Sequence, residues 1–419
     1  MHFFQHKAGV LHCEECSVEA IAREVGTPFY LYSYRTLVRH FQAFDSAFQD
    51  LPHLVCYSAK ANSNMAVLRT FIALGGGVDI VSGGELFRAL HAGADPGKIV
   101  YSGVGKREDE IRYALEEKIL MFNVESYQEL HLINGIASRM RIQAPVALRI
   151  NPDIDPQTHP YIATGMKEAK FGIAIDQALA WYHEAKALPH LTIRGVSCHL
   201  GSQLTEMGPF VQAIRRAKKL VLTLRQEGIA IDYVDLGGGL GITYHQEEPP
   251  APQEYADALI EEARDLPCTF IFEPGRVLVG NAGILVTRVL YTKEGEKNFV
   301  VVDAAMNDLV RPTLYGSYQE LVSIKEKQGE EMVADMVGPI CESGDFLARD
   351  RVMPRFAPGD LVAVMSAGAY GFAMSSTYNS RPRVAEVLVK DDAFHLIRER
   401  ETYADLTRGE RIPPFLEGK

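Results

Sequence analysis

An alternation of strand-like and helix-like segments over the first two thirds of the chain limits its fold more than any other feature. Short apolar runs rich in β-formers alternate with stretches of helical periodicity, such as Phe210–Arg225. Eight such units in series over about 230 residues match the size of a (β/α)8 TIM-type barrel. A doubly wound sheet is the competing layout, but Gly237–Gly241 lacks the GxGxxG spacing of its nucleotide-binding turn. The predicted barrel strands are Leu54–Lys60, Gly77–Ser82, Ile99–Gly103, Ile119–Val124, Val146–Asn151, Ile193–Gly201, Tyr233–Gly239 and Phe270–Arg276.

The pattern changes after about residue 283, where short strand-like runs follow one another without helices between them. Ile284–Tyr291 and Phe299–Asp303 flank Lys293–Glu296, which predicts a hairpin. We therefore expect an α/β chain with a barrel over residues 41–283 and an all-β, β-barrel-like domain over residues 284–419, with residues 1–40 packing on the β domain. Further strands of this domain are predicted at Leu361–Ser366, Val384–Val389 and Phe394–Glu401.

Composition and charge exclude several classes of protein. The chain has 419 residues and a formal charge of −11, whereas a nucleic-acid-binding surface is basic. No apolar run is long enough to cross a bilayer, and the N-terminus lacks the apolar core of a signal peptide. We therefore expect a cytoplasmic protein with reduced cysteines. Cys13 and Cys16 have metal-knuckle spacing, but no second pair completes four ligands, so no metal site is predicted.

Distinctive polar residues fall where the predicted barrel strands end, which is the catalytic face of such a barrel. Any single one has a structural explanation, since Asp and Asn cap helices, Gly forms turns, and a lysine at a strand end is commonly solvated. Their gathering on one rim is much harder to explain in that way. The clusters are Lys60 after the first strand, Asp79 and Ser82–Glu85 after the second, Arg149–Pro152 after the fifth, His199–Gln203 after the sixth, Asp235–Gly239 after the seventh and Glu273–Arg276 after the eighth.

This set of residues matches the needs of a pyridoxal phosphate (PLP) site. The cofactor requires a lysine for its Schiff base, and Lys60 supplies one. Its phosphate requires closely approaching backbone N–H groups, which Gly237–Gly239 and Gly275 can offer after strands seven and eight. Glu273 is placed to keep the pyridine nitrogen protonated, and the flat ring of His199 can pack against the cofactor. Ordinary loop chemistry is the alternative explanation for the glycines.

The same residues resemble the fold-type III PLP-dependent decarboxylases, from about Phe29 to Arg383. That resemblance implies a homodimer with active sites shared across the interface, in which Cys341 and Glu342 reach the Lys60 site of the partner subunit. The motifs that carry it are Tyr57–Asn62, His199–Gln203, Gly237–Gly241, Glu273–Arg276 and Cys341–Asp345.

The resemblance also implies a role for each site residue. Lys60 and Cys341 are expected to be catalytic, with Cys341 returning a proton to the carbon that loses CO2. The substrate is expected to bind Arg276, Arg311, Tyr315 and Glu342 at its distal end, and Tyr370 is expected to contact both the substrate and the cofactor phosphate. The expected cofactor-binding residues are Lys60, Asp79, His199, Ser202, Gly238, Gly239, Glu273, Gly275, Arg276 and Tyr370.

Decarboxylation is favoured over the other reactions that such folds carry out. Alanine racemase resembles this fold but places an arginine at the pyridine nitrogen, whereas Glu273 would keep a pyridinium. Racemisation also needs acid–base groups on both faces of the substrate, and no second tyrosine motif is present. A PLP-carrying protein without turnover resembles the barrel alone, and a metal-dependent hydrolase needs an early histidine grouping that the sequence lacks.

The charges expected at the substrate's distal end favour meso-diaminopimelate. Ornithine and lysine end in a lone ammonium, whereas diaminopimelate ends in an ammonium and a carboxylate. Arg276 and Arg311 can fork onto the carboxylate, and Glu342 can accept the ammonium. A solvent-exposed arginine before a turn is the alternative for Arg311. The expected reaction is the conversion of meso-diaminopimelate to L-lysine and CO2, the last step of lysine biosynthesis.

Overall fold

The computed structural model describes residues 2–155, 165 and 170–416 of the chain. The chain divides into two compact units. One unit consists of Tyr34–Ala282, and the other combines Met1–Ser33 with Gly283–Lys419. We call them the barrel unit and the sheet unit. The division assigns residues 34–40 to the barrel unit, so the expected start of the barrel at residue 41 falls inside the helix α2 (Tyr34–Ala47).

The barrel unit contains a closed ring of eight parallel strands among its described residues, which confirms the predicted TIM-type barrel. Each predicted run forms a strand, and the ring closes where the eighth strand pairs with the first. A short strand, β10 (Ile173–Ala174), adds to the edge of β9. The ring strands in order are β5 (His53–Ser58), β6 (Gly77–Ile80), β7 (Ile99–Tyr101), β8 (Met121–Val124), β9 (Ala144–Asn151), β11 (Leu191–Cys198), β12 (Tyr233–Asp235) and β13 (Thr269–Phe272).

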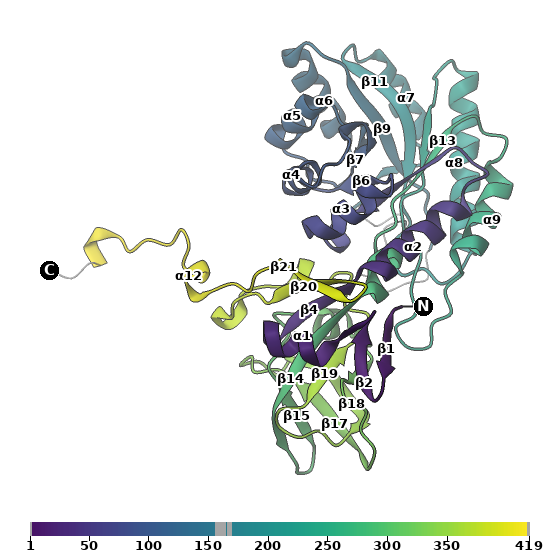
Figure 1. Ribbon diagram of the computed structural model, residues 1–419. Helices are drawn as coiled ribbons and strands as arrows, with labels where there is room; N and C mark the ends of the chain where they lie inside the picture. The colour runs from purple at the N-terminus through teal and green to yellow at the C-terminus, as the bar shows by residue number, and fades with distance from the viewer. Residues whose placement is uncertain (1, 156–164, 166–169, 417–419) are drawn as a thin grey trace. The chain divides into compact units, whose positions relative to one another are not determined.

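Helices surround these strands, as Figure 1 shows. Their amphipathic pattern explains why they form there: in α8 (Gly208–Gln226), Phe210, Ile214, Ala217 and Val221 are buried at helical spacing. The remaining helices are α2, α3 (Met65–Ala73), α4 (Gly83–His91), α5 (Glu108–Glu117), α6 (Tyr127–Met140), α7 (Ala178–Ala187), α9 (Pro252–Ala263) and α10 (Arg276–Val279).

Aromatic side chains fasten α2 to the barrel. Phe44 on α2 lies edge-on to Phe272 of β13, with ring centroids 6.0 Å apart, and Phe48 stacks on the same ring at 3.9 Å. Phe41 stacks on Phe71 of α3 at 5.7 Å. Such pairs add to the free energy gained by burying the rings themselves. Because α2 packs on barrel elements, the barrel unit begins at Tyr34.

The sheet unit is built on a strand path with the order β18-β17-β15-β14-β4-β20-β21. The expected hairpin is present, since β14 (Gly283–Lys293) and β15 (Phe299–Val302) pair antiparallel. The strand β4 (Phe29–Ser33) lies between β14 and β20, so the N-terminal segment supplies an inner strand to a sheet made mostly from the C-terminal third. The other strands are β16 (Leu321–Ser323), β17 (Glu331–Val337), β18 (Phe346–Pro354), β19 (Leu361–Val364), β20 (Ala385–Lys390) and β21 (Ala393–Arg398), with a separate small sheet of β1 (Phe4–Lys7), β2 (Val10–Cys13) and β3 (Cys16–Ser17).

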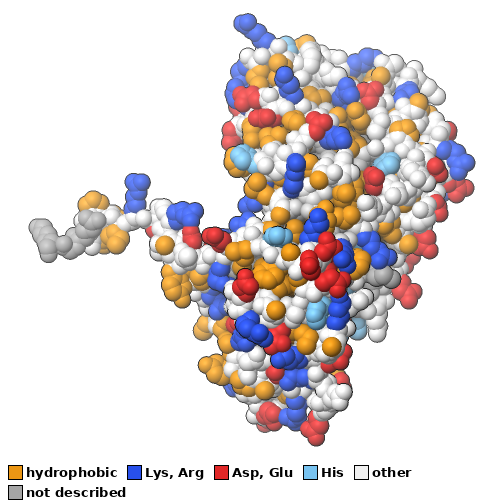
Figure 2. Space-filling model, viewed as in Figure 1, with side chains coloured by type: hydrophobic (Ala, Val, Ile, Leu, Met, Phe, Trp, Pro, Cys, Tyr) orange, Lys and Arg blue, Asp and Glu red, His pale blue; other side chains and the backbone are white. Residues whose placement is uncertain are grey.

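The surface charge, the cysteines and the helices can be compared with the classes of protein that composition argued against. Figure 2 shows acidic and basic side chains interspersed on the visible face. All six cysteines are free thiols, and Cys341 is the exposed one. Among the described residues, no helix is long and apolar enough to span a membrane, and no group of three His, Cys, Asp or Glu side chains is arranged to hold a metal ion.

Candidate active site

Lys60 lies just beyond the end of β5, in a single 3-10 turn over Ala59–Ala61, rather than at the end of the strand. Its Nζ forms an ion pair with Asp79 Oδ2 at 3.0 Å. The Lys60 side chain is 35% exposed, whereas Asp79 on β6 is completely buried. Ser58 donates a second hydrogen bond to Asp79 Oδ2, and the other carboxylate oxygen, Oδ1, is buried with no hydrogen-bond partner among the described residues. The barrel therefore presents a lysine amine at its rim, anchored by a buried carboxylate.

A second pair of buried carboxyl groups lies at the ends of the next-to-last and last barrel strands. Asp235 ends β12, and Glu273 follows β13. Burial raises the pKa of Asp235 to about 6 and the pKa of Glu273 well above its ordinary range, and the charges of Asp235 and Asp79 raise the Glu273 pKa further. The positive charge of Lys60 opposes that rise. A nearby cation would stabilise the ionised form of a carboxyl group in these surroundings.

His199 follows β11 and carries a neutral ring. Burial lowers its pKa well below the ordinary value, and the positive charges of Arg149 and Lys60 lower it further. Gly238 N–H donates to His199 Nδ1 at 3.1 Å. The ring proton is therefore assigned to Nε2, because Nδ1 acts as an acceptor. A flat neutral ring at this edge of the barrel suits packing against an aromatic cofactor.

The glycine run Gly237–Gly239 has a packing role that the sequence analysis did not foresee. A Cβ on Gly237, which has φ +66°, would lie 2.4 Å from His199 Nδ1, and one on Gly238 would lie 2.3 Å from the carbonyl oxygen of Glu273. Gly237 N–H donates to Asp235 Oδ1 at 2.9 Å, and Gly238 N–H donates to His199. Two of the expected phosphate-binding donors therefore already have protein partners. The absence of side chains here allows strands β11, β12 and β13 to meet closely at their ends.

Arg276 begins α10 and is 4% exposed. Its guanidinium donates to Ser202 Oγ at 3.0 Å and to the Tyr244 hydroxyl at 2.6 Å. Gly275 precedes it, and a Cβ at that position would lie 3.1 Å from the Cβ atoms of Ala61 and Ser58. The expected residues Ser202, Gly275 and Arg276 thus adjoin one another and the Lys60 turn.

The sheet unit holds the other expected residues. Arg311 and Tyr315 lie on the short helix α11 (Arg311–Tyr315), with the Arg311 guanidinium 5.4 Å from the centre of the Tyr315 ring. Thr313 of this helix donates to the Gly344 carbonyl at 2.5 Å, which ties α11 to the segment that contains Cys341 and Glu342. Tyr370 occupies the left-handed region with φ +56°.

The Cys341 segment is held by two residues from the same unit. Asn379 Oδ1 accepts a hydrogen bond from Cys341 N–H at 3.0 Å, and the Tyr378 hydroxyl donates to Glu342 Oε2 at 2.8 Å. Cys341 is exposed. In the sheet unit, the structure thus brings Arg311 and Tyr315 together with the Cys341–Glu342 segment, while Tyr370 lies in the same unit.

Comparison with known proteins identifies the family. The model of the family described as "Pyridoxal-dependent decarboxylase, pyridoxal binding domain" matches residues 34–280. The chain is 50% identical to the diaminopimelate decarboxylase of Vibrio cholerae over 99% of its own length and 100% of that protein. The chain belongs to the diaminopimelate decarboxylase family. It is a PLP-dependent decarboxylase.

Solved structures of this family have the same fold. The diaminopimelate decarboxylase of Helicobacter pylori, complexed with L-lysine, is 42% identical, with a TM-score of 0.91 over 93% of this chain and 98% of that one. The enzyme from M. jannaschii, also in complex with L-lysine, is 38% identical, with a TM-score of 0.94 over 99% of this chain and 98% of that one. The expectation of a decarboxylase with a barrel and a sheet domain is confirmed.

The residues of the barrel rim fit PLP. Among the described residues, Asp79 Oδ1 is a buried carboxylate oxygen without a hydrogen-bond partner, beside the Lys60 amine. Glu273 is a buried carboxyl whose pKa is raised by burial and by the charges of Asp235 and Asp79. A pyridinium nitrogen would supply a cation to stabilise its ionised form, and His199 offers a neutral ring for the cofactor's face.

Several residues of the site were missed from the sequence. Ser102 and Asn123 contact Glu273, and Tyr244 and Tyr378 contact Arg276 and Glu342. Asn123 had a detectable signal, because it is a buried polar residue inside the apolar strand β8. The tyrosines had none, since an aromatic residue in a loop predicts neither a partner nor a site.

Proposed function

We propose that this member of the family removes one carboxyl group from meso-diaminopimelate to yield L-lysine and CO2, with Lys60 holding the PLP. The observation that carries the assignment of Lys60 is its ion pair with the buried Asp79, in a barrel whose rim also holds Glu273 and His199. Identity of 50% to two diaminopimelate decarboxylases, over 99% of this chain, supports the substrate.

Bound PLP supplies an electron sink for the pair of electrons that CO2 leaves on the substrate carbon. Glu273 would hold a negative charge at the ring nitrogen of bound PLP, and its burial would strengthen that charge's effect. Asp79 orients the Lys60 amine and keeps a negative charge beside it. Neutral His199 would pack on the ring of bound PLP without adding positive charge. Ser202, Gly238 and Gly239 are proposed at the phosphate, with Gly275 giving close approach; Gly238 would there exchange its bond to His199 or share it.

Arg276 and Arg311 are proposed to bind the distal carboxylate of the substrate, and Glu342 its distal ammonium. The fork of a guanidinium matches a carboxylate, and both arginines are buried, which strengthens such contacts. Tyr315 and Tyr370 are proposed to complete the substrate pocket, Tyr370 also at the phosphate.

Cys341 is proposed to return the proton from its Sγ to the carbon that loses CO2. Its exposure and the anchoring of its backbone by Asn379 suit a thiol that acts outside its own unit. We propose a homodimer in which Cys341 and Glu342 enter the site of the other copy, and a cytoplasmic location, where its free thiols stay reduced.

The test of Lys60 combines reduction with mutation. Borohydride treatment of the PLP-loaded protein, followed by peptide mapping, should place the pyridoxyl group on Lys60. Lys60→Ala should bind no cofactor covalently and lose turnover of diaminopimelate, while Lys219→Ala on the exposed face of α8 should retain both. Label on another lysine would contradict the assignment. Faster turnover of ornithine than of diaminopimelate would contradict the substrate.

A further inference from the structure

A buried ammonium, that of Lys106, lies next to the residues that contact Glu273. Lys106, in the segment between β7 and α5, has a side chain only 1% exposed. All three of its N–H groups have partners: Gly103 O at 2.9 Å, Asn123 O at 2.8 Å and Glu129 Oε1 at 2.7 Å. Burying a charge is unfavourable unless it is paired and hydrogen-bonded, and a buried ion pair adds little net stability. This pair therefore calls for a role other than stability.

Glu125 forms a second buried set of hydrogen bonds next to those of Lys106 and Glu129. We call the two sets, one around Lys106 and Glu129 and the other around Glu125, the clamps. Glu125 Oε1 accepts from Gly103 N–H at 3.1 Å and from the Arg149 guanidinium at 2.6 Å, and its Oε2 accepts from Gly172 N–H at 2.9 Å. Glu125 N–H donates to Glu129 Oε2 at 3.0 Å, which joins the two clamps. Gly103 is thus held at its N–H by the Glu125 carboxylate and at its carbonyl by the Lys106 ammonium.

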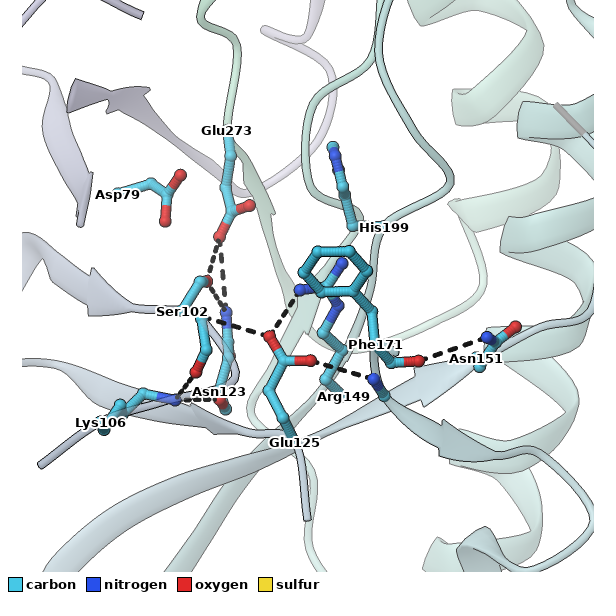
Figure 3. Close-up of polar contacts among 12 residues, drawn as sticks. Asp79, Ser102, Lys106, Asn123, Glu125, Arg149, Asn151, Phe171, His199 and Glu273 are labelled. Atoms are coloured by element: carbon cyan, nitrogen blue, oxygen red, sulfur yellow. Dashed lines mark hydrogen bonds and ion pairs between the residues drawn. The ribbon is translucent and has the colours of Figure 1, made fainter. Parts of the chain in front are cut away.

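The backbone held in this way carries two of the side chains that contact Glu273; Asp235 is a further hydrogen-bond partner of that carboxyl group. Ser102 precedes Gly103, and its hydroxyl donates to Glu273 Oε1 at 3.3 Å. Asn123, whose carbonyl Lys106 binds, has its Nδ2 2.7 Å from Asp235 Oδ2, 3.0 Å from Ser102 Oγ and 3.4 Å from Glu273 Oε1. Figure 3 shows Ser102 and Asn123 between the Lys106 ammonium and the Glu273 carboxylate.

We infer that Lys106, Glu129 and Glu125 are positioning residues that hold Ser102 and Asn123 against the Glu273 carboxylate, and so set its place at the cofactor ring. The inference rests on the proposed role of Glu273. The clamps fix the ends of β7 and β8, which adjoin one another in the ring, so a shift of either end moves a donor away from Glu273. A displacement of about 1 Å near a reacting group can lower a rate on the order of 100-fold.

The experiment compares Lys106→Met with Lys218→Met, which removes an ammonium from an ion pair on the outer helix α8 (Lys218 Nζ to Asp265 Oδ1, 2.6 Å). The readouts are the affinity of apoprotein for PLP, the pH dependence of the bound cofactor's absorbance band, and the separate kcat and KM for diaminopimelate. Lys106→Met should lower kcat roughly 10- to 100-fold and shift the pH dependence of the band, with KM nearly unchanged. Lys218→Met should match the unmutated protein in all three.

A charge-balanced variant, Lys106→Met/Glu129→Leu, removes both buried charges and avoids stranding Glu129, so it keeps the test decisive if Lys106→Met fails to fold. If the folded charge-balanced variant keeps the pH dependence of the cofactor band and the kcat of the unmutated protein, the inference is overturned.

A double-mutant comparison then asks whether Lys106 acts through Glu273. In a Glu273→Gln background, Lys106→Met should cause no further change in cofactor affinity or band position. The same loss in both backgrounds would show that Lys106 supports the barrel generally, and would also overturn the inference. Unmutated protein that binds PLP on Lys60 yet leaves diaminopimelate intact would instead refute the proposed function, while the cofactor affinity and spectrum would still test the positioning residues.

Discussion

At the scale of single residues, the buried carboxyl groups of the two units have different surroundings. Asp79 is paired with Lys60, and Glu273 lies among Ser102, Asn123 and Asp235, where a cofactor nitrogen can ionise it. Asp308 in the sheet unit is 1% exposed and has neutral hydrogen-bond partners, the N–H of Ala305 and the amide of Asn307. The first group is arranged for charge chemistry, whereas burial opposes the ionisation of Asp308.

Asp308 predicts a pH-dependent loss of stability. Burial raises its pKa to about 7, whereas an aspartate in an unfolded chain titrates near 4. A carboxyl whose pKa is raised by folding adds stability that is fully present below about pH 4 and is lost as the pH rises through about 7. At about 1.4 kcal/mol for each pH unit between the two values, that loss is at most about 4 kcal/mol.

Asp308→Asn should remove this part of the pH dependence, because an amide imitates the protonated acid. Asn307 Oδ1 is buried without a hydrogen-bond partner in the described structure, and a flip of the Asn307 amide would turn that acceptor toward the new amide in place of Nδ2. We expect the variant to be more stable than the unmutated protein at pH 8 and to keep only a small part of that advantage at pH 5, as measured by urea unfolding. Asp335→Asn, at a carboxylate that pairs with Lys297, serves as the control and should give no gain at pH 8. If the free energy of unfolding of Asp308→Asn falls between pH 5 and pH 8 as steeply as that of the unmutated protein, the link between Asp308 ionisation and stability is refuted.

At the scale of elements, the sequence predicted the barrel strands well because each is a short apolar run between helices of clear period. It missed β4, whose residues Phe29–Ser33 are all buried, because the run stands apart from the strands that it joins. It also missed β17 and β18, where charged residues interrupt the apolar run. Lys60 was predicted correctly as a rim residue, yet its 3-10 turn was not, since three residues carry no periodicity. The clamp residues Lys106 and Glu125 escaped notice because a charge in a loop is ordinarily solvated.

The inner strand β4 predicts a specific cost for losing one hydroxyl. Tyr32 is fully buried, and its hydroxyl donates to Glu386 Oε1 of β20 at 2.8 Å, while Glu386 Oε2 pairs with Arg398 of β21 at 2.7 Å. Tyr32→Phe removes a donor from a buried carboxylate, which should lower the free energy of unfolding by about 1–3 kcal/mol. The measurement is denaturant unfolding followed by tyrosine fluorescence. Tyr291→Phe, at a side chain 67% exposed on β14, is the matched control and should change stability by less than about 0.5 kcal/mol. Equal effects of the two substitutions would show that the Tyr32 hydroxyl contributes nothing.

At the scale of the whole molecule, the site residues are divided between two units. The barrel unit holds the residues proposed for the cofactor other than Tyr370, and the sheet unit holds Tyr370 together with Arg311, Cys341 and Glu342. Sequence motifs identified both sets because each motif is local, but the sequence of one chain does not determine which copy completes a given site. That question concerns the assembly, so its test must be made on mixed subunits.

The proposed sharing of sites predicts rescue between two inactive variants. Lys60→Ala and Cys341→Ala homodimers should each be nearly inactive. A mixed dimer has one site with both lesions and one with neither, so it should recover up to about half of the activity of an unmutated dimer. The reason is that a proton donor must lie within about 3 Å of its target, and no distant thiol can replace Cys341. Subunits with different tags would be mixed in mild denaturant, dialysed, purified through both tags and assayed for release of CO2 from diaminopimelate.

The control pairs Lys60→Ala with Cys268→Ala, which alters a buried thiol of the barrel unit. The Cys268→Ala homodimer should be active by itself, and its mixed dimer with Lys60→Ala should keep about half of that activity whether or not sites are shared, which calibrates the assay. Cysteine is often a small apolar filler, and in that role Cys341→Ala would give an active homodimer. Cys341 is exposed in the single chain, so it does not fill space in a core, and its thiol is open to contact with another subunit. Heterodimers that form yet stay inactive would instead place Cys341 in the site of its own chain. In that arrangement, one site of the mixed dimer lacks Lys60 and the other lacks Cys341, so neither site is intact.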